Sequence, residues 1–284
     1  MCAAEGTGRR LPGPAGTRFA AVRWFEEIDS TNRWLADEAR AGAPEGAVAA
    51  ARWQTAGRGR LGRRWEAPPG ANLLVSVLLR PTYGAAAVHR SAAAVSLAAA
   101  DACAEVAGVA PGCKWPNDLV VGDRKLAGVL AEVVADPGGV LAEGRPCALV
   151  VGIGLNVHWP PPDAGGAPGP PADADGVLRT ATSLWREGGA RAAAVTPAQV
   201  LASLLASLER RLAAVEGDEG PAALDGEYRR RCVTLGRAVR VIGGTQTVEG
   251  RAVDLTEAGH LVVEVGGRRV TVAAGDVVHL RHAG

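Results

Sequence analysis

The sequence predicts an α+β protein with a large domain followed by a smaller, strand-rich domain. The chain has 284 residues, of which 48% are hydrophobic, so it can bury a substantial core. Strand-like and helix-like segments alternate through most of the chain, and this texture changes at about residue 235. We therefore expect a large domain over 18–234 and a small β-barrel over 235–284.

Local signals place the elements of the first half. Residues 1–17 are dominated by Gly, Pro and Ala, which predicts a disordered tail. Either Asp29 or Ser30 is the expected N-cap of a helix that stops at Gly42. The elements expected after the tail are a strand at 19–28, a helix at 29–42, strands at 45–54 and 72–79, and an Ala-rich helix at 88–107.

The second half begins with two strand-like runs within 113–134, and the Gly122-Asp123 pair between them predicts a hairpin. A buried strand is expected at 147–157, followed by a solvated Pro/Gly/Ala loop at 159–177. Thr196 as N-cap, Pro197 in the first turn and a stripe of leucines predict the next helix, and another helix is expected at 221–232. After residue 235, short alternating runs separated by GG, EAG and GG turns predict the small barrel.

Composition excludes several classes of protein. The net charge of +1 gives no general footprint for DNA or an anionic membrane, and no apolar run has the length and composition of a membrane span. The five cysteines include no C-x-x-C pair, and the first residues do not form a signal peptide, so a cytoplasmic location is expected. Any site for an anionic ligand must therefore be local.

A glycine-arginine loop, "WQTAGRGRLGRRWEAPPGAN" at 53–72, contains the pattern G-x-G-x-x-G. The dinucleotide-binding interpretation of that pattern fails, because the following prolines oppose a helix and no acidic residue lies between Glu66 and Asp101. Four arginines in the loop suit the oxygens of a phosphate or a carboxylate: Arg58, Arg60, Arg63 and Arg64. We expect a loop that is disordered when empty and closes over an anionic ligand.

Three further polar clusters stand out. The "STN" at 30–32 begins a helix with three hydrogen-bonding side chains, which suit an amide or ureido group, although helix capping also accounts for Ser30. The "KWPND" at 114–118 forms a turn between strand-like runs, and Asn156 ends a buried strand. Lys114 and Lys125 are the only lysines among 31 basic residues, a pattern that either chance or a need for a compact ammonium can produce.

Taken together, these motifs resemble those of the biotin protein ligases, which attach biotin to a lysine of carboxylase carrier domains. The resemblance covers nearly the whole chain after the tail, through "STN", "QTAGRGRLGRRW", "KWPNDL", "DRKLAGVLAE", "GIGLNV" and "ATSL". It implies a mixed-sheet α+β catalytic domain of the class II aminoacyl-tRNA synthetase-like, biotin/lipoate ligase type. A small C-terminal SH3-like β-barrel would follow it.

The resemblance also implies roles for individual residues. Those that would hold biotin are Ser30, Thr31, Asn32, Gln54, Arg58, Gly59, Arg60, Lys125 and Gly128, with Trp53 nearby. Those that would hold ATP or the adenylate are Arg60, Arg63, Trp65, Lys114, Asn117 and Asn156. Arg58, Lys125 and Asp118 would be catalytic, with Asp118 either holding Mg²⁺ indirectly or orienting the incoming lysine, whereas Trp115 is harder to assign.

The implied reaction joins biotin to AMP with release of pyrophosphate and then passes biotin to an acceptor lysine. ATP and biotin would be substrates, Mg²⁺ would assist, and biotin carboxyl carrier domains would be the partners. This reaction explains the arginines of the loop. The biotin carboxylate must approach the ATP phosphates, and positive side chains offset the repulsion between these two anions. No direct protein metal site and no Ser-His-Asp set is needed, and the five scattered histidines are interpreted as structural or surface residues.

Two alternatives remain open from the sequence. A lipoate or octanoate ligase of the same fold is one, although the polar "STN" and the multi-arginine loop favour biotin. A non-catalytic nucleic-acid-binding module is the other, and the near-zero net charge argues against it. Because about 18 residues precede the first expected strand, we expect a monofunctional ligase that does not bind DNA. Edge strands could support a homodimer, but the sequence does not select one.

Overall fold

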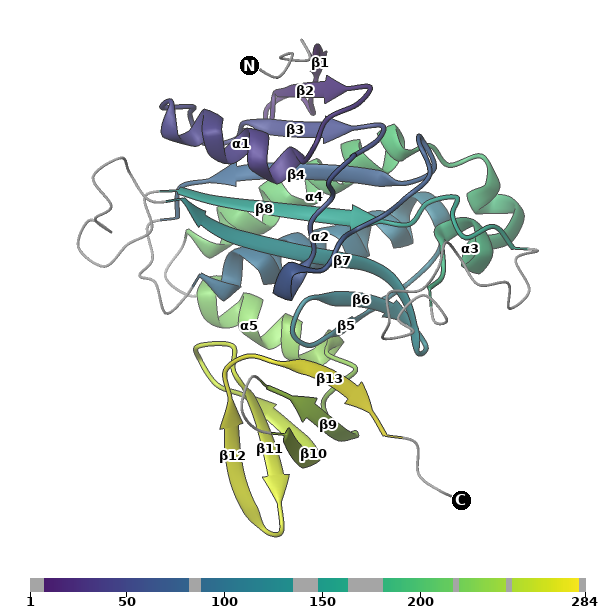
Figure 1. Ribbon diagram of the computed structural model, residues 1–284. Helices are drawn as coiled ribbons and strands as arrows, with labels where there is room; N and C mark the ends of the chain where they lie inside the picture. Colours follow the sequence, from purple (N-terminus) through teal and green to yellow (C-terminus); the bar gives the residue numbers. More distant parts are fainter. Residues whose placement is uncertain are drawn as a thin grey trace.

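A computed structural model describes residues 8–81, 88–134, 148–162, 181–216, 220–243 and 247–280. Most of the predicted loop at 159–177 and the first residues of the predicted tail lie outside these residues. The chain forms a large mixed sheet with helices on both faces, followed by a small antiparallel sheet (Figure 1). This arrangement confirms the predicted α+β class and the strand-rich C-terminal domain.

The large sheet has eight strands in the order β1-β2-β3-β4-β8-β7-β6-β5. Its first four strands are β1 (Arg9–Pro12), β2 (Ala21–Phe25), β3 (Val48–Ala51) and β4 (Leu73–Leu79). The other four are β5 (Gly112–Lys114), β6 (Asp118–Val121), β7 (Arg124–Val134) and β8 (Ala148–Leu155). The β2 and β3 strands are parallel and the other neighbours are antiparallel. Every residue of β4 is buried, as expected for a central strand covered on both faces.

Helices cover the two faces of this sheet unequally. On one face α2 (His89–Ala107) and α4 (Pro197–Val215) pack together in the main core, where the small alanines of α2 allow a close approach. The remaining helices are α1 (Thr31–Arg40), α3 (Leu184–Ala193) and α5 (Gly220–Arg231). The α1 helix lies on the opposite face, over one end of the sheet (Figure 1). Next to the start of α1, residues of β7, β8 and the glycine-arginine loop line a cavity.

Several predicted element boundaries are confirmed. Ser30 caps α1 and accepts a hydrogen bond from the Arg33 backbone, and Thr196 and Gln199 form a capping box at α4. In the predicted hairpin, Val121 pairs with Arg124 across Gly122-Asp123, and Gly122 has a φ of 60°. The prediction of a disordered tail is wrong for residues 8–17, because β1 pairs antiparallel with β2 at the edge of the sheet. The short helix α3 was not predicted.

The C-terminal domain is an antiparallel sheet in the order β12-β11-β10-β9-β13. Its strands are β9 (Ala238–Ile242), β10 (Thr247–Leu255), β11 (Leu261–Val265), β12 (Arg268–Val272) and β13 (Asp276–His279). Its core includes Val239, Val241, Leu261 and Val263, together with Trp115 from the large domain. Trp115 also donates its indole N–H to the carbonyl of Gly259 at 2.9 Å. The two domains therefore share a packed boundary.

No single helix in the described part of the chain is long and apolar enough to cross a membrane. The pair α3 and α4 passes the length and composition test only when joined, and these helices meet at a bend of 104°.

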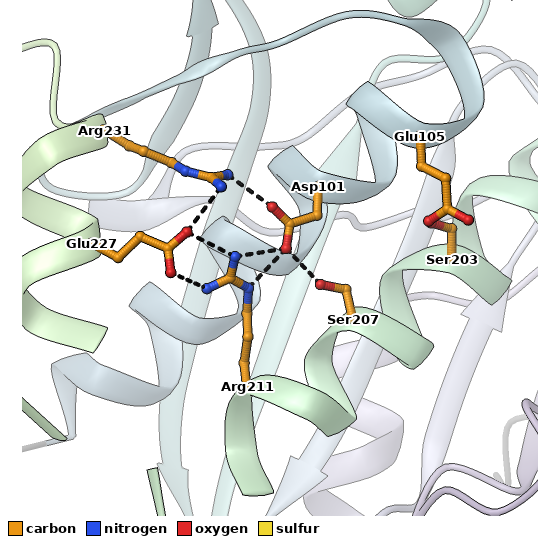
Figure 2. A network of polar contacts seen from close by, with 7 residues as sticks. All are labelled: Asp101, Glu105, Ser203, Ser207, Arg211, Glu227 and Arg231. Atoms are coloured by element: carbon orange, nitrogen blue, oxygen red, sulfur yellow. Dashed lines mark hydrogen bonds and ion pairs between the residues drawn. The ribbon is translucent and has the colours of Figure 1, made fainter. Parts of the chain in front are cut away.

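One cluster of charged side chains and one separate hydrogen bond join the helices. Figure 2 shows Arg211 of α4 and Arg231 of α5 converging on Asp101 of α2, with Glu227 of α5 contacting both arginines. Ser207 also donates to Asp101 at 2.7 Å, and a separate bond joins Ser203 to Glu105. These contacts lie among α2, α4 and α5, and none of their residues lines the cavity beside α1.

Candidate active site

The "STN" cluster lies at the start of α1, and its three side chains have different hydrogen-bond partners. Ser30 caps the helix, whereas Thr31 and Asn32 are 3% and 5% exposed. Gln54 reaches Thr31 because residues 28 and 54 pair in a parallel bridge after β2 and β3. The Gln54 Oε1 accepts from the Thr31 backbone N–H at 2.7 Å and lies 3.0 Å from the Thr31 hydroxyl. Four predicted head-group residues therefore meet at one place.

Ser76 of β4 extends this cluster, and sequence reasoning did not identify it. Its hydroxyl lies 2.7 Å from the Thr31 hydroxyl and donates to Asn32 Oδ1 at 2.5 Å. Gly152 of β8 makes room for the pair, because a Cβ there would lie 2.1 Å from Asn32 Oδ1. The local signal was present as a serine within the apolar run "LLVSVLL" and as the glycines of "GIG". The cross-strand contact was not encoded locally.

The glycine-arginine loop folds back on itself as an irregular hairpin. Arg58 and Arg64 face each other in an antiparallel bridge, and the Gly59 N–H donates to Arg63 O at 2.8 Å. Only a three-residue 3₁₀ turn, η1 (Arg60–Gly62), occurs at the tip. Gly57 permits the close return of the chain, since a Cβ there would lie 2.3 Å from Trp65 O. The loop contains no α-helix, which agrees with the rejection of a dinucleotide motif.

Each leg of the hairpin is held by a carboxylate from another part of the fold. Arg58 pairs with Glu132 of β7 at 2.8 Å, and Arg63 pairs with Asp276 at the start of β13. Arg60 lies between them and donates to Asn117 Oδ1 at 3.1 Å. Burial lowers the pKa of the Arg60 guanidinium, although Asp276 and Asp118 oppose that effect. The C-terminal domain thus contributes directly to the surroundings of the loop.

Two paired glycines form the floor beneath Trp65. Gly128 of β7 and Gly154 of β8 face each other across their strands, and Cβ atoms there would lie 3.2 Å and 2.3 Å from the Trp65 ring. Lys125 lies beside Gly128, with its Nζ 5.7 Å from the Trp65 ring centroid and 2.7 Å from Asp118 Oδ1. The buried Trp65 indole N–H has no hydrogen-bond partner within the described residues. The Trp65 ring, its unpaired indole N–H and the Lys125 ammonium therefore lie together above the two glycines.

Asn156 and Asn117 are held by the protein at both ends of their amides. Asn156 accepts from Asn72 at 2.8 Å and donates to Thr182 O at 2.9 Å. Asn117 donates to Val129 O at 2.9 Å while accepting from Arg60. These contacts fix the walls of the site, including the segment of the "ATSL" motif that begins at Ala181.

Most of these groups line one cavity of about 390 Å³. The predicted site residues on its wall are Ser30, Thr31, Asn32, Gln54, Arg58, Gly59, Arg60, Arg63, Trp65, Asn117, Asp118, Lys125, Gly128 and Asn156. Arg64 of the predicted anion-binding loop is also on the wall, and wall residues that the sequence did not indicate include Gly152, Gly154, Trp159 and Asp276.

Three residues expected at or near the site are not on this wall. Trp115 faces a second cavity of about 420 Å³ at the domain boundary, and Trp53 lies outside the first cavity. Lys114 stands one strand away, directly across from Asp118 in the β5–β6 ladder. Burial lowers the pKa of the Lys114 ammonium, and Asp118 opposes that effect. Lys114 is therefore absent from the cavity wall in this structure, and its contact with the ATP phosphates stays a prediction.

The described residues contain no group of three or more His, Cys, Asp or Glu side chains that could hold a metal ion. Asp118 and Asp276 do reach the cavity wall. Mg²⁺ commonly takes one or two protein carboxylates together with substrate phosphates, so this donor set fits magnesium delivered with a nucleotide.

Comparison with known proteins agrees with this geometry. Residues 24–156 match the model of the biotin/lipoate A/B protein ligase family, and residues 234–280 match the biotin protein ligase C-terminal domain. The biotin--[acetyl-CoA-carboxylase] ligase of Mycobacterium tuberculosis is 38% identical over 273 residues, which span 94% of this chain and 92% of that protein. The chain belongs to the biotin protein ligase family. It is accordingly a ligase, and the cavity lined by residues of β7 and β8 is its candidate active site.

Other members of the biotin protein ligase family support the assignment. The corresponding ligase of Paracoccus denitrificans is 34% identical over 227 residues, which cover 79% of this chain and 87% of that protein. The biotin protein ligase of Aquifex aeolicus, solved with biotin and ATP, has the same fold, with a TM-score of 0.70 and 24% identity over 92% of this chain and 98% of that chain. The Leishmania major biotin protein ligase, solved with biotin, gives a TM-score of 0.57 and 25% identity, with 92% and 98% of the two chains covered.

Proposed function

We propose that this ligase activates biotin with ATP to form biotinyl-5′-AMP and then transfers biotin to a lysine of a carboxylase carrier domain. The observation that supports it most is the division of one cavity into two chemically distinct parts. One end presents neutral hydrogen-bonding groups from Thr31, Asn32 and Gln54. The other presents Lys125 and the arginines of the hairpin around Trp65. Biotin carries a neutral ureido ring at one end and a carboxylate at the other. The ureido ring matches the neutral end of the cavity, and the carboxylate matches the positively charged end.

The first step requires that two anions be brought together. In it a biotin carboxylate oxygen forms a bond to the α-phosphorus of ATP, while the bond to pyrophosphate breaks. We assign Lys125, Arg58 and Arg60 to stabilise the negative charge on the carboxylate and phosphates. Trp65, over its glycine floor, offers a stacking surface to the nucleotide. Magnesium delivered with ATP would supply further charge neutralisation, and Asp118 would hold it indirectly.

The second step leaves biotin on the acceptor protein. The amine of the acceptor lysine bonds to the acyl carbon of the mixed anhydride, AMP leaves, and the amine loses a proton. Asp118 is our candidate for orienting that amine, since its carboxylate already holds the ammonium of Lys125 at 2.7 Å. The hairpin over the cavity would shield the anhydride from water, and we keep the prediction that it closes on binding.

The relatives are named for an acetyl-CoA carboxylase substrate, which supports a carboxylase carrier domain as the acceptor here. We further propose a cytoplasmic location, which is supported by three free, buried cysteines, Cys103, Cys113 and Cys232. A homodimer stays a prediction, as does the boundary at residues 234 and 235.

The decisive experiment measures pyrophosphate release with ATP and Mg²⁺, with biotin, lipoate and octanoate offered separately. Release with biotin alone is the expected result, and Lys125→Met and Arg58→Ala should each abolish most of it. Arg240→Gln is the matched control, because Arg240 pairs with Glu249 in the C-terminal domain, away from the cavity wall. Release with lipoate or octanoate would transfer the assignment to a lipoate or octanoate ligase. Silence with all three acids in folded protein would contradict the proposal.

A further inference from the structure

Glu132 of β7 contacts both ends of the candidate biotin site through one carboxylate. Its Oε2 accepts from the Asn32 amide at 2.8 Å, and its Oε1 lies 2.8 Å from Arg58 Nη2. Arg58 Nη1 also approaches Oε2 at 3.4 Å, so the arginine contacts both carboxylate oxygens. Asn32 belongs to the polar head-group cluster, and Arg58 belongs to the hairpin over the cavity. Glu132 is thus the shared partner of two regions more than twenty residues apart in sequence.

The position of Glu132 follows from the register of β7. Gly128, Leu130 and Glu132 alternate along one face of the strand, and the first two line the cavity. The Glu132 side chain is 27% exposed, which places its carboxylate at the rim rather than in open solvent. A contact at the rim can join the floor of the site to a loop that lies above it.

Glu132 also decides which end of the Asn32 amide faces the rest of the cluster. An ionised carboxylate can only accept, and the Leu130 carbonyl, which lies 3.3 Å from the same nitrogen, can also only accept. The Asn32 NH₂ group must therefore point toward β7, and its Oδ1 must point toward the Ser76 hydroxyl. The carboxylate fixes the orientation of a head-group side chain while it holds Arg58.

We propose that Glu132 is a positioning residue that couples occupancy of the head-group site to placement of the hairpin. This inference rests on the proposed function, since it assigns the coupled ligand as biotin. A ligand that fixes the position of the Asn32 side chain also fixes the Glu132 carboxylate, because the two are hydrogen-bonded. The Glu132 carboxylate in turn fixes the position of Arg58. Coupling between two sites acts equally in both directions, so a fixed hairpin also strengthens head-group binding.

The Glu132→Gln variant tests this coupling with little change in shape. A glutamine side chain has one accepting oxygen and one donating nitrogen, so it cannot accept from Asn32 and from Arg58 on separate oxygens. Trypsin reports on the hairpin, because it cleaves after arginine and four arginines lie within 58–64. Biotin should slow cleavage of the hairpin in the unaltered protein, and Glu132→Gln should lose most of this protection even at saturating biotin. The KM for biotin should rise about fivefold, the effect of about 1 kcal/mol, with a smaller change in the KM for ATP.

Two further variants separate coupling from a general structural role. Glu249→Gln, in a cross-strand pair with Arg240, is the matched control and should leave protection and both KM values unchanged. Arg58→Gln breaks the same contact from the other side while it leaves the Asn32–Glu132 bond in place. If the two residues act through one contact, the double variant should lose no more biotin protection than the worse single variant.

The outcomes are distinguishable. Failure of biotin to protect the unaltered protein would overturn the proposed function and, with it, this role for Glu132. Equal protection in unaltered and Glu132→Gln protein, or strictly additive losses in the double variant, would overturn the coupling alone and leave the ligase assignment intact.

Discussion

A Cβ atom at residue 154 would lie 2.3 Å from Cε2 of Trp65, so Gly154 and the Trp65 ring occupy neighbouring space that no larger residue could share. The Gly154→Ala variant should push the indole off the floor of the cavity. We expect the KM for ATP to rise about tenfold or more, because a displaced ring loses its stacking geometry. Steady-state pyrophosphate release at varied ATP measures this change.

The control for this variant is Gly226→Ala in α5, where a Cβ would meet only Arg230 Nη1 at 3.5 Å. Alanine within a helix should leave activity unchanged and stabilise the protein by up to about 1 kcal/mol. An unchanged KM for ATP in Gly154→Ala would show that Trp65 does not hold the nucleotide.

Lys125 should not tolerate replacement by arginine. Its ammonium fits between Asp118, 2.7 Å away, and the Trp65 ring, and a planar guanidinium has a different reach and donor pattern. Lys125→Arg should lower kcat for pyrophosphate release by about 100-fold, the range found when one stabilising donor is removed from an active site. Single-turnover formation of the adenylate measures it, and a rate within threefold of the unaltered protein would contradict the assigned role.

The helix network of Figure 2 should matter for stability and not for catalysis. Asp101 accepts from Arg211 at 2.6 Å and from Arg231 at 2.9 Å, and the Arg211 side chain is only 13% exposed. Asp101→Asn removes one of the two carboxylates that hold the Arg211 guanidinium, leaving Glu227, and should reduce the free energy of unfolding by about 2 kcal/mol. Urea unfolding measures this loss.

Asp37→Asn supplies the comparison, because the Asp37–Arg40 pair is more than half exposed on both sides. Its effect on the free energy of unfolding should be below about 1 kcal/mol. If both variants unfold at the same urea concentration, the network contributes nothing beyond an ordinary surface pair.

His279 should make the stability of the protein sensitive to mild acid. Burial, with Lys114 and Arg237 nearby, lowers the pKa of His279 from 6.5 to about 4. The unfolded chain therefore binds a proton between those two pH values that the folded chain does not bind. The stability contributed by the neutral ring is complete above pH 6.5 and is lost as the pH falls toward 4, by at most about 1.4 kcal/mol per pH unit. Urea unfolding of His279→Gln and the unaltered protein at pH 7.5 and pH 5 should show a shallower loss in the variant, and parallel losses would contradict this prediction.

Features encoded by neighbouring residues could be predicted from the sequence. The Ser30 cap, the Gly122-Asp123 hairpin and the Thr196 capping box each depend on a few adjacent side chains, and all three are present. The motifs also identified most residues of the cavity wall, although their assignment to biotin or ATP stays a prediction.

Features that depend on pairing between distant segments could not be predicted in this way. The β1 strand forms because β2 offers it an edge, although the composition of residues 1–17 is that of a disordered tail. Ser76, Glu132 and Asp276 enter the site from three different strands, and each is an ordinary polar residue in its local sequence. The α3 helix was missed because it contains a Gly188-Gly189 pair, in which Gly189 has a φ of 56°.

Trp115 lies beside the active-site turn in sequence, yet its ring is buried in the core of the C-terminal domain. Its indole N–H donates to the carbonyl of Gly259, and its own backbone N–H donates to Thr234, just before the first C-terminal strand. If C-terminal domains were exchanged between relatives, the new domain would therefore have to provide the same packing and hydrogen-bond partners for Trp115. The two domains can therefore be transplanted only as a pair, because Trp115 in the turn between β5 and β6 packs into the C-terminal domain.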